Sequence, residues 1–372
     1  MKTFVPVENG DTLQAVRGVL RRILESGQVE ALMVPLRTPA GTVMPALVTD
    51  PALLDQADPL APVYPVNAAR ALGWMTQREP RGRIGAVMRS CEMRAMIELV
   101  KLKQACVDCI TLISVDCAGT YDVPVYLDAV AQPDNLLWPL LFDDPLASGS
   151  NGGPALRDAC QMCERPVYDE AQVVVQLLGH DLAKGFSVVL PDEMAGALNW
   201  APASDADGRR AMVDKLVAQR TARRDAVLCE TRDKLNSGRP GEGLQTLFAA
   251  CIRCHNCMTA CPICYCKTCL FKGPVFDHDP IQYMTWAKRK GALRLPSDTM
   301  LFHLTRLNHM ALSCIGCGAC TSVCPVDIPV GRVFRAVGGN VQSVFDYVPG
   351  FNPQELLPLV AFQAEEWQEV GE

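Results

Sequence analysis

Residues 251–262 read CIRCHNCMTACP, and residues 314–325 read CIGCGACTSVCP. Both segments follow one pattern: three cysteines separated by two residues each, a fourth cysteine after three more residues, and then a proline. This spacing is typical of paired 4Fe–4S clusters, in which three thiolates of one run bind one cluster and the fourth binds the other. The repeat therefore predicts two cubane clusters that share their ligands crosswise.

The crossed arrangement assigns each cluster three cysteines of one run and the last cysteine of the other. The first cluster is predicted on Cys251, Cys254, Cys257 and Cys324. The second is predicted on Cys314, Cys317, Cys320 and Cys261. Zinc is disfavoured, because zinc sites use two cysteine pairs whereas each run here supplies four cysteines. Two clusters in one small domain favour conduction of single electrons over catalysis.

The two runs are separated by 314 − 261 − 1 = 52 residues, too many for a compact ferredoxin with short hairpins. Much of this gap has a helical pattern, at residues 281–290 and 298–312. The segment resembles the α-helical ferredoxin domain of heterodisulfide reductase and succinate dehydrogenase iron–sulfur subunits. We therefore expect a mostly helical two-cluster domain.

The composition of the whole chain agrees with a globular, multidomain protein. It has 372 residues, 35 basic and 41 acidic side chains, a net charge of −6 and 49% hydrophobic residues. These values exclude wholesale disorder and disfavour a nucleic-acid binder, which would be basic. The sequence predicts no secretory signal and no membrane span. With 18 cysteines, a cytoplasmic location is expected, because thiols stay reduced there.

The N-terminal half alternates between helical and strand patterns. Such alternation predicts βαβ units, and so an α/β domain with a largely parallel sheet. Helices are expected at 11–26 and 92–104, and strands at 30–36, 42–49, 84–88, 110–115, 173–178 and 186–190. Pro35 and Pro45 favour edge positions for the strands that contain them.

The sequence predicts four consecutive regions. They are an α/β domain at 1–200, a helical linker at 201–243, the α-helical ferredoxin domain at 244–337 and a C-terminal tail at 338–372. The linker contains one long charged helix at 205–236, whose interleaved charges, among them Arg209, Arg220 and Arg224, predict a solvated face.

A third 4Fe–4S cluster is predicted on the α/β domain. Cys91 and Cys117 each follow a strand, and parallel strands place both at the carboxyl edge of the sheet, where α/β folds bind ligands. The pair Cys160 and Cys163 supplies two more thiolates at ligand spacing.

Six cysteines remain outside these three sets. Cys106 and Cys109 precede the strand at 110–115, so they lie at the opposite edge of the sheet. They could form a redox pair or half of a metal site, but buried or idle thiols are expected. Cys264, Cys266 and Cys269 follow the first cluster run closely. They could hold a further metal with Cys229, or they could serve packing.

The α/β half resembles the β-subunit family of deazaflavin-dependent hydrogenases and formate dehydrogenases over roughly residues 10–190. The matching segments are RIGAV at 83–87, RSCEMRA at 89–95, ELVKL at 98–102, VDCAGT at 115–120 and CQMCE at 160–164, followed by an alternating apolar segment at 171–179. The two-cluster domain fits the formate dehydrogenase version best.

The resemblance implies an iron–sulfur flavoprotein: an electron-transfer subunit of a formate dehydrogenase, hydrogenase or heterodisulfide-reductase-like complex. FAD is implied, and its electrons would pass to the clusters. The two-electron carrier could be the deazaflavin coenzyme, a nicotinamide or a ferredoxin. No catalytic residue is predicted on this chain, because its five histidines are scattered. His255 lies inside a cluster loop and is expected to tune or shield that cluster.

Topology suggests where the flavin would bind. The helix that begins at Glu92 would offer its N-terminus to the pyrophosphate, aided by Arg89 and Arg94, and Gly119 with Thr120 would offer backbone.

The chain departs from the family pattern at residues 8–12, ENGDT, which contain a single glycine where a glycine-rich turn is expected. No Rossmann fingerprint is present either. The alternative is a flavin-less wiring subunit that bridges its partners.

Overall fold

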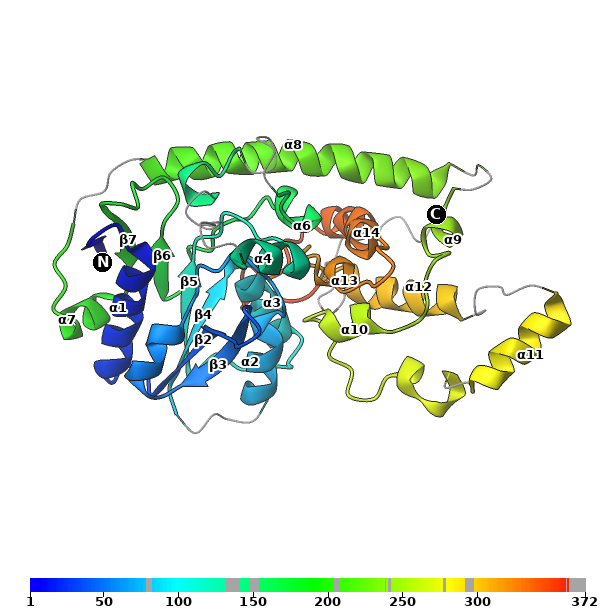
Figure 1. Cartoon of the computed structure of the whole chain (residues 1–372), viewed down its shortest axis with the longest axis horizontal. Coiled ribbons are helices and arrows are strands. Elements are labelled where there is room, and N and C mark those ends of the chain that lie inside the picture. Colours follow the sequence, from blue (N-terminus) through cyan, green and yellow to red (C-terminus); the bar gives the residue numbers. More distant parts are fainter. Residues whose placement is uncertain are drawn as a thin grey trace. The chain divides into compact units, whose positions relative to one another are not determined.

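The structure is a computed structural model of the whole chain, shown in Figure 1. It describes residues 1–77, 82–131, 141–147, 154–203, 208–237, 239, 242–276, 279–291, 298–358 and 360. The start of the predicted linker helix at 205–207 and the end of the tail at 361–372 lie outside the described residues.

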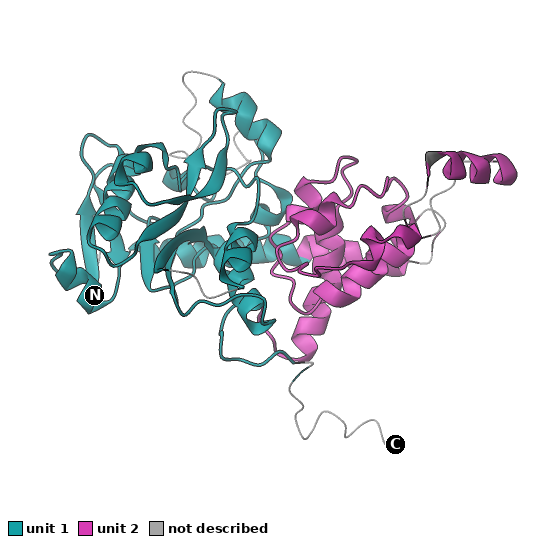
Figure 2. Cartoon of the chain, turned by 90° about the horizontal axis from the view of Figure 1, so that it is seen from below, with its two compact units in different colours: residues 1–225, 350–372 teal, residues 226–349 magenta. Residues whose placement is uncertain are grey.

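Contacts divide the chain into two units, coloured separately in Figure 2. Unit 1 comprises residues 1–225 and 350–372, and unit 2 comprises residues 226–349. Unit 1 is the α/β half and unit 2 is the mostly helical, cysteine-rich half, as the sequence predicts. The four domain boundaries given above remain a prediction.

The described residues of unit 1 form one seven-stranded sheet in the order β1-β7-β6-β5-β4-β2-β3. The strands are β1 (Lys2–Pro6), β2 (Ala31–Arg37), β3 (Val43–Val48), β4 (Ile84–Arg89), β5 (Ile110–Val115), β6 (Val173–Gln176) and β7 (Gly185–Val189). Strands β2, β4, β5 and β6 pair in parallel, while β3 and β7 run antiparallel to their neighbours. The largely parallel sheet is confirmed, and β1 is an edge strand that the sequence pattern missed.

The two prolines occupy different kinds of strand. Pro45 lies on the edge strand β3, as predicted, but Pro35 lies on β2, which has neighbours on both sides. Strand β2 pairs with β4 only through Ala31, Leu32 and Met33. Pro35 is tolerated because its missing N–H falls beyond that stretch of pairing.

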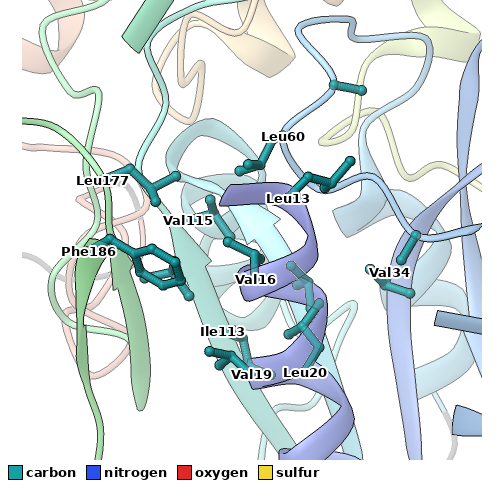
Figure 3. Packing of buried hydrophobic residues seen from close by; sticks show 14 of the residues in the cluster. Leu13, Val16, Val19, Leu20, Val34, Leu60, Ile113, Val115, Leu177 and Phe186 are labelled. Atoms are coloured by element: carbon teal, nitrogen blue, oxygen red, sulfur yellow. The ribbon is translucent and has the colours of Figure 1, made fainter. Parts of the chain in front are cut away.

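Helices cover the sheet of unit 1. They are α1 (Thr12–Glu25), the 3-10 helix η1 (Pro51–Gln56), α2 (Ala68–Thr76), α3 (Ser90–Lys101), α4 (Val123–Val130), α6 (Asp158–Gln161) and α7 (Asp192–Ala197). Helix α1 begins after Asp11, whose carboxylate accepts the N–H of Gln14 at 2.9 Å. Its apolar stripe of Val16, Val19 and Leu20 faces the sheet in Figure 3. This contact is part of one extensive hydrophobic cluster among the described residues of unit 1.

Helix α8 (Gly208–Asn236) runs from unit 1 into unit 2. In unit 1 it is anchored by its basic residues, so the predicted solvated face is wrong there. Arg209 pairs with the fully buried carboxylate of Asp116 at 2.7 Å. Arg220 is 4% exposed and donates to the carbonyl of Ala118. Arg209 and Arg220 are directed inward because their partners, Asp116 and Ala118, are remote in sequence and buried in unit 1.

The last described residues return to unit 1. The N–H of Gly350 donates to the buried carboxylate of Glu98 at 2.6 Å, and Lys101 pairs with Glu355 at 2.8 Å. The ring of Phe351 meets Tyr168 edge-on, with 6.2 Å between centroids. Residues 350–355 of the tail therefore pack against unit 1 of their own chain.

Unit 2 is built from short helices and loops. They are α9 (Leu244–Leu247), α10 (Asn256–Ala260), η2 (Leu270–Lys272), η3 (Pro274–Phe276), α11 (Pro280–Lys290), α12 (Thr299–Met310), α13 (Ala319–Ser322) and α14 (Val330–Val344). Helices α11 and α12 confirm the helical pattern predicted between the cysteine runs. Phe248, Met310 and Phe334 form one small core, and Met258, Phe271 and Phe302 form another.

Among the described residues, no helix is long and apolar enough to cross a membrane.

Candidate metal centres

The first predicted set of cysteines lines one cavity in unit 2. Cys251, Cys254 and Cys257 come from the loop before and within α10, and Cys324 comes from the end of the second run. His255, Phe302 and His303 complete much of the remaining wall. The last cysteine of the second run is thus brought to the first three cysteines of the other run.

The second predicted set also gathers in unit 2. The pKa of Cys261 is raised to about 12, mainly by burial; the guanidinium of Arg306 opposes this shift, and the nearby thiols of Cys317, Cys264 and Cys314 add to it. Burial and the charge of Cys261 likewise hold the pKa of Cys320 far above its ordinary value. Cys261 is therefore within electrostatic reach of Cys314, Cys317 and Cys320 of the second run.

The two loops share one backbone conformation. The residue two positions after the first cysteine and the residue four positions after it have positive φ in both runs. These residues are Arg253 and His255 in the first run, with φ of 57° and 61°, and Gly316 and Gly318 in the second, with φ of 73° and 68°. Such turns point successive N–H groups inward as an anion-binding concavity. The N–H of Arg253 accordingly donates to Cys251 Sγ at 3.4 Å.

Buried thiols in the first set resist ionisation unless a cation compensates them. Burial raises the pKa of Cys257 to about 11, although Arg306 lowers it. Burial also raises the pKa of Cys251. A protein-bound cluster takes thiolates, so iron would replace the protons that burial otherwise retains.

Helix α12 supplies two polar groups to the first set. His303 Nε2 lies 3.3 Å from Cys251 Sγ, and the ring stacks on Phe248 with centroids 3.8 Å apart. Burial and then the charges of Arg306 and His255 lower the pKa of His303 to about 3, so the ring is neutral at pH 7. His255 also lines the cavity, and its predicted role in tuning or shielding the cluster stays a prediction. His303 and Arg306 were not predicted as site residues. The feature of the sequence that could have indicated them is their spacing, three positions apart on the otherwise apolar face of α12.

The third predicted set gathers at the carboxyl edge of the sheet in unit 1. Cys91 lies in the first turn of α3 after β4, and Cys117 follows β5. Burial raises the pKa of Cys117 to about 11, and the charges of Cys160 and Cys163 add to this shift after the opposing effect of Arg89. All four thiols therefore lie within electrostatic reach of one another or of Arg89.

Three buried arginines surround this third set. Burial lowers the pKa of Arg89, but the negative charges of Glu92, Cys117, Cys91 and Cys160 raise it more. Arg157 and Arg220 are 3% and 4% exposed. Arg157 Nη1 lies 4.0 Å from Cys160 Sγ, and the charge of Arg220 lowers the pKa of Cys163, which burial raises. This cationic shell suits an anionic cluster.

All three sets consist of four cysteines. Thiolates are the ligands that 4Fe–4S clusters use. The residues present therefore fit such clusters.

The predicted flavin contacts have other partners in the structure. The two carboxylate oxygens of Glu92 accept the N–H groups of Ala68 and Arg89, each at 3.0 Å. The guanidinium of Arg89 donates to the carbonyls of Val63 and Ala61. A carboxylate thus occupies the N-terminus of α3, and this arrangement does not fit a pyrophosphate there.

The other three flavin contacts lie close to the third cysteine set. Thr120 Oγ1 lies 3.2 Å from Cys160 Sγ, and a Cβ at Gly119 would meet Leu156 at 2.6 Å. Arg94 is buried in α3, where its backbone underlies Gly350. The flavin roles of all five residues stay a prediction.

The remaining cysteines show no further four-thiol set among the described residues. Cys106 Sγ lies 3.3 Å from a carboxylate oxygen of Asp108, at the amino end of β5. Cys266 and Cys229 are exposed, and Cys269 Sγ contacts the sulfur of Met258 at 3.6 Å. These contacts favour the packing alternative for Cys269.

Comparison with known proteins first defines the class of the helical half. Residues 247–328 match the 4Fe–4S dicluster domain family, and this range contains all eight cysteines of the two runs. The chain therefore carries a domain for two 4Fe–4S clusters.

The whole chain is similar to β subunits of F420-dependent formate dehydrogenases. It is 23% identical to the subunit of Methanocaldococcus jannaschii over 295 residues, covering 72% of this chain and 74% of that protein. It is 23% identical to that of formate dehydrogenase 1 of Methanococcus maripaludis over 379 residues, covering 94% and 93%. The resemblance predicted from the sequence is confirmed.

A solved structure of the xenon-derivatised F420-reducing [NiFe] hydrogenase complex from Methanosarcina barkeri contains a chain with a TM-score of 0.43 and 12% identity. That match covers 67% of this chain and 96% of the other.

Proposed function

We propose that this protein is the iron–sulfur electron-transfer subunit of a formate dehydrogenase or hydrogenase type of oxidoreductase complex. The observation that carries the proposal is the crosswise gathering of eight thiols into two sets in unit 2. Clusters held this way exchange single electrons.

The ligands of the three clusters follow the three sets. Cys251, Cys254, Cys257 and Cys324 hold the first cluster, and Cys314, Cys317, Cys320 and Cys261 hold the second. Cys91, Cys117, Cys160 and Cys163 hold the third. The cavity wall, the shared electrostatics and the arginine shell support these assignments. Because such clusters need reduced thiols, the cytoplasm is the compartment that suits the protein.

The partners follow from the relatives. Their names describe formate dehydrogenases that depend on F420. By analogy, the formate-oxidising centre lies on a partner subunit, and F420 is the two-electron carrier. Coupling a hydride carrier to one-electron clusters requires a group that accepts two electrons and releases them singly, which is flavin chemistry.

FAD in unit 1 is therefore the finer proposal. The names of the relatives, which describe dependence on F420, support this proposal. The N-terminus of α3 is not the proposed location, because the carboxylate of Glu92 occupies it. The flavin-less wiring subunit is the second candidate. The carboxylates at the N-termini of α1 and α3 favour it, because Asp11 and Glu92 occupy positions where a pyrophosphate would bind.

The complex should be purified without oxygen through a tag on this chain. Formate is expected to reduce the clusters, giving paramagnetic resonance signals, and oxidised F420 is expected to remove those signals. The variant Cys251→Ala should lose this coupling, whereas Cys106→Ala, at a cysteine outside the assigned clusters, should keep it. Clusters that formate and F420 leave unchanged would contradict the proposed function.

Flavin released by acid decides between the two versions of unit 1. About one FAD per chain supports the flavoprotein. Clusters that formate reduces in a chain that carries no FAD support the wiring subunit.

A further inference from the structure

Arg306 on helix α12 is a buried cation without a carboxylate partner among the described residues. Arg306 is only 4% exposed. Its Nη1 donates to Cys257 Sγ at 3.1 Å and its Nη2 donates to the carbonyl of Cys257 at 3.0 Å. Buried arginines are normally paired with an anion, because an isolated buried charge is costly.

The anions that face Arg306 come from both cysteine sets. Burial lowers the pKa of the guanidinium, but the charges of Cys257, Cys261 and Cys320 raise it more, followed by that of Cys264. Cys257 belongs to the first set, whereas Cys261 and Cys320 belong to the second. Cys320 packs against the buried cluster of Cys257, Met258, Phe271 and Phe302, and the guanidinium lies over the ring of Phe302. The guanidinium therefore faces cysteines of both predicted clusters.

The surroundings hold the guanidinium in place and keep water away. Its central carbon lies 4.9 Å from the ring centroid of Phe334 and 5.4 Å from that of Phe302. Both rings are buried. In such low-dielectric surroundings a charge acts strongly on its neighbours and is little screened by salt.

We propose that Arg306 is the shared countercharge of the two clusters in unit 2 and raises the reduction potential of both. This inference rests on the proposed function, because it requires both clusters. Reduction adds one electron to a cluster that is already anionic. A fixed positive charge nearby stabilises the reduced form more than the oxidised form, and hydrogen bonds to cluster sulfurs act in the same direction.

The effect should differ between the clusters. The first cluster receives a direct hydrogen bond at Cys257 Sγ as well as the charge. For the second cluster the structure gives the charge alone. Removing Arg306 should therefore lower both potentials, and that of the first cluster more.

The test is an anaerobic redox titration of the full chain, followed by paramagnetic resonance, with iron counted in each sample. Arg306→Met and Arg306→Gln remove the charge, and Arg306→Lys keeps it. The control is Arg232→Met, which removes an arginine of the same unit that hydrogen-bonds Asn340 at 3.0 Å. We expect lower potentials in the two neutral variants and nearly unchanged potentials in Arg306→Lys and the control.

Several outcomes would overturn the proposal. One is a fully loaded neutral variant in which both potentials are unchanged, or in which only the first potential falls. Another is loss of both clusters from all three Arg306 variants, which would make the residue purely structural.

If a neutral variant retains one cluster, the potential of that cluster should still fall. If only the neutral variants lose both clusters, the charge itself is required, as the proposal expects. Wild-type protein without iron would instead contradict the proposed function.

Discussion

Two adjacent glycines on α14 should respond to alanine in opposite ways. A Cβ at Gly338 would lie 2.7 Å from the carbonyl oxygen of Ala311, whereas a Cβ at Gly339 would meet nothing within 4 Å. Both residues are helical, so each Gly→Ala change should gain about 1 kcal/mol from helix propensity. At Gly338 the overlap with rigid backbone should cost about 2–3 kcal/mol.

The net effects follow from these terms. Gly339→Ala should stabilise unit 2 by about 1 kcal/mol, and Gly338→Ala should destabilise it by about 1–2 kcal/mol. Gly338→Ala should also weaken the retention of the second cluster. Gln342, one helical turn further along, donates from Nε2 to the carbonyls of Ala311 and Cys314, each at 3.0 Å.

The assay is anaerobic thermal unfolding of both variants at one scan rate, together with the rate of iron loss to a chelator. The melting temperatures should differ by roughly 5–10 °C between the variants, with the faster iron loss in Gly338→Ala. Equal stability of the two variants would refute the tight approach of α14 to the end of α12.

Three further predictions concern the clusters and unit 1. Cys324→Ser should remove the same paramagnetic signal as Cys251→Ser, and Cys261→Ser should remove the other; loss of the signal of its own run in either case would contradict the crossed ligands. Gly350→Ala should release the tail, because its φ of 76° and a Cβ 2.3 Å from the carbonyl oxygen of Arg94 exclude a side chain; limited proteolysis should cut the variant faster, and unchanged cleavage would argue against docking. Arg209→Met should destabilise unit 1 by about 2–4 kcal/mol, since it strips the cation from a buried carboxylate; unfolding in urea that matches wild type would disprove this role.

Much of the fold could be predicted from local sequence. The strands at 84–89 and 110–115 are continuous apolar runs, typical of the buried centre of a parallel sheet, and their bounds match the pattern closely. Strand β1 was missed because Lys2–Pro6 is short and lies at an edge. The interior position of Pro35 depends on how far β4 extends, which no local pattern encodes.

The candidate site also has one part that local sequence predicts and another part that only the fold determines. Cluster ligands could be predicted because iron requires thiolates at fixed spacing. The cations around them could not, because each depends on a tertiary contact. Arg220 sits in a charged helix that predicts a solvated face, yet it is buried against Ala118. Arg306 and His303 lie on α12 with no sequence motif, and only the fold brings them to Cys257 and Cys251.

The most direct test of the central claim is the metal content of the chain, purified without oxygen, together with its paramagnetic resonance spectrum after dithionite. Two clusters in unit 2 predict about eight irons and eight acid-labile sulfides per chain, with about four more of each for the cluster of unit 1, and signals from reduced clusters. Zinc in place of iron, or a colourless protein without such signals, would contradict the account.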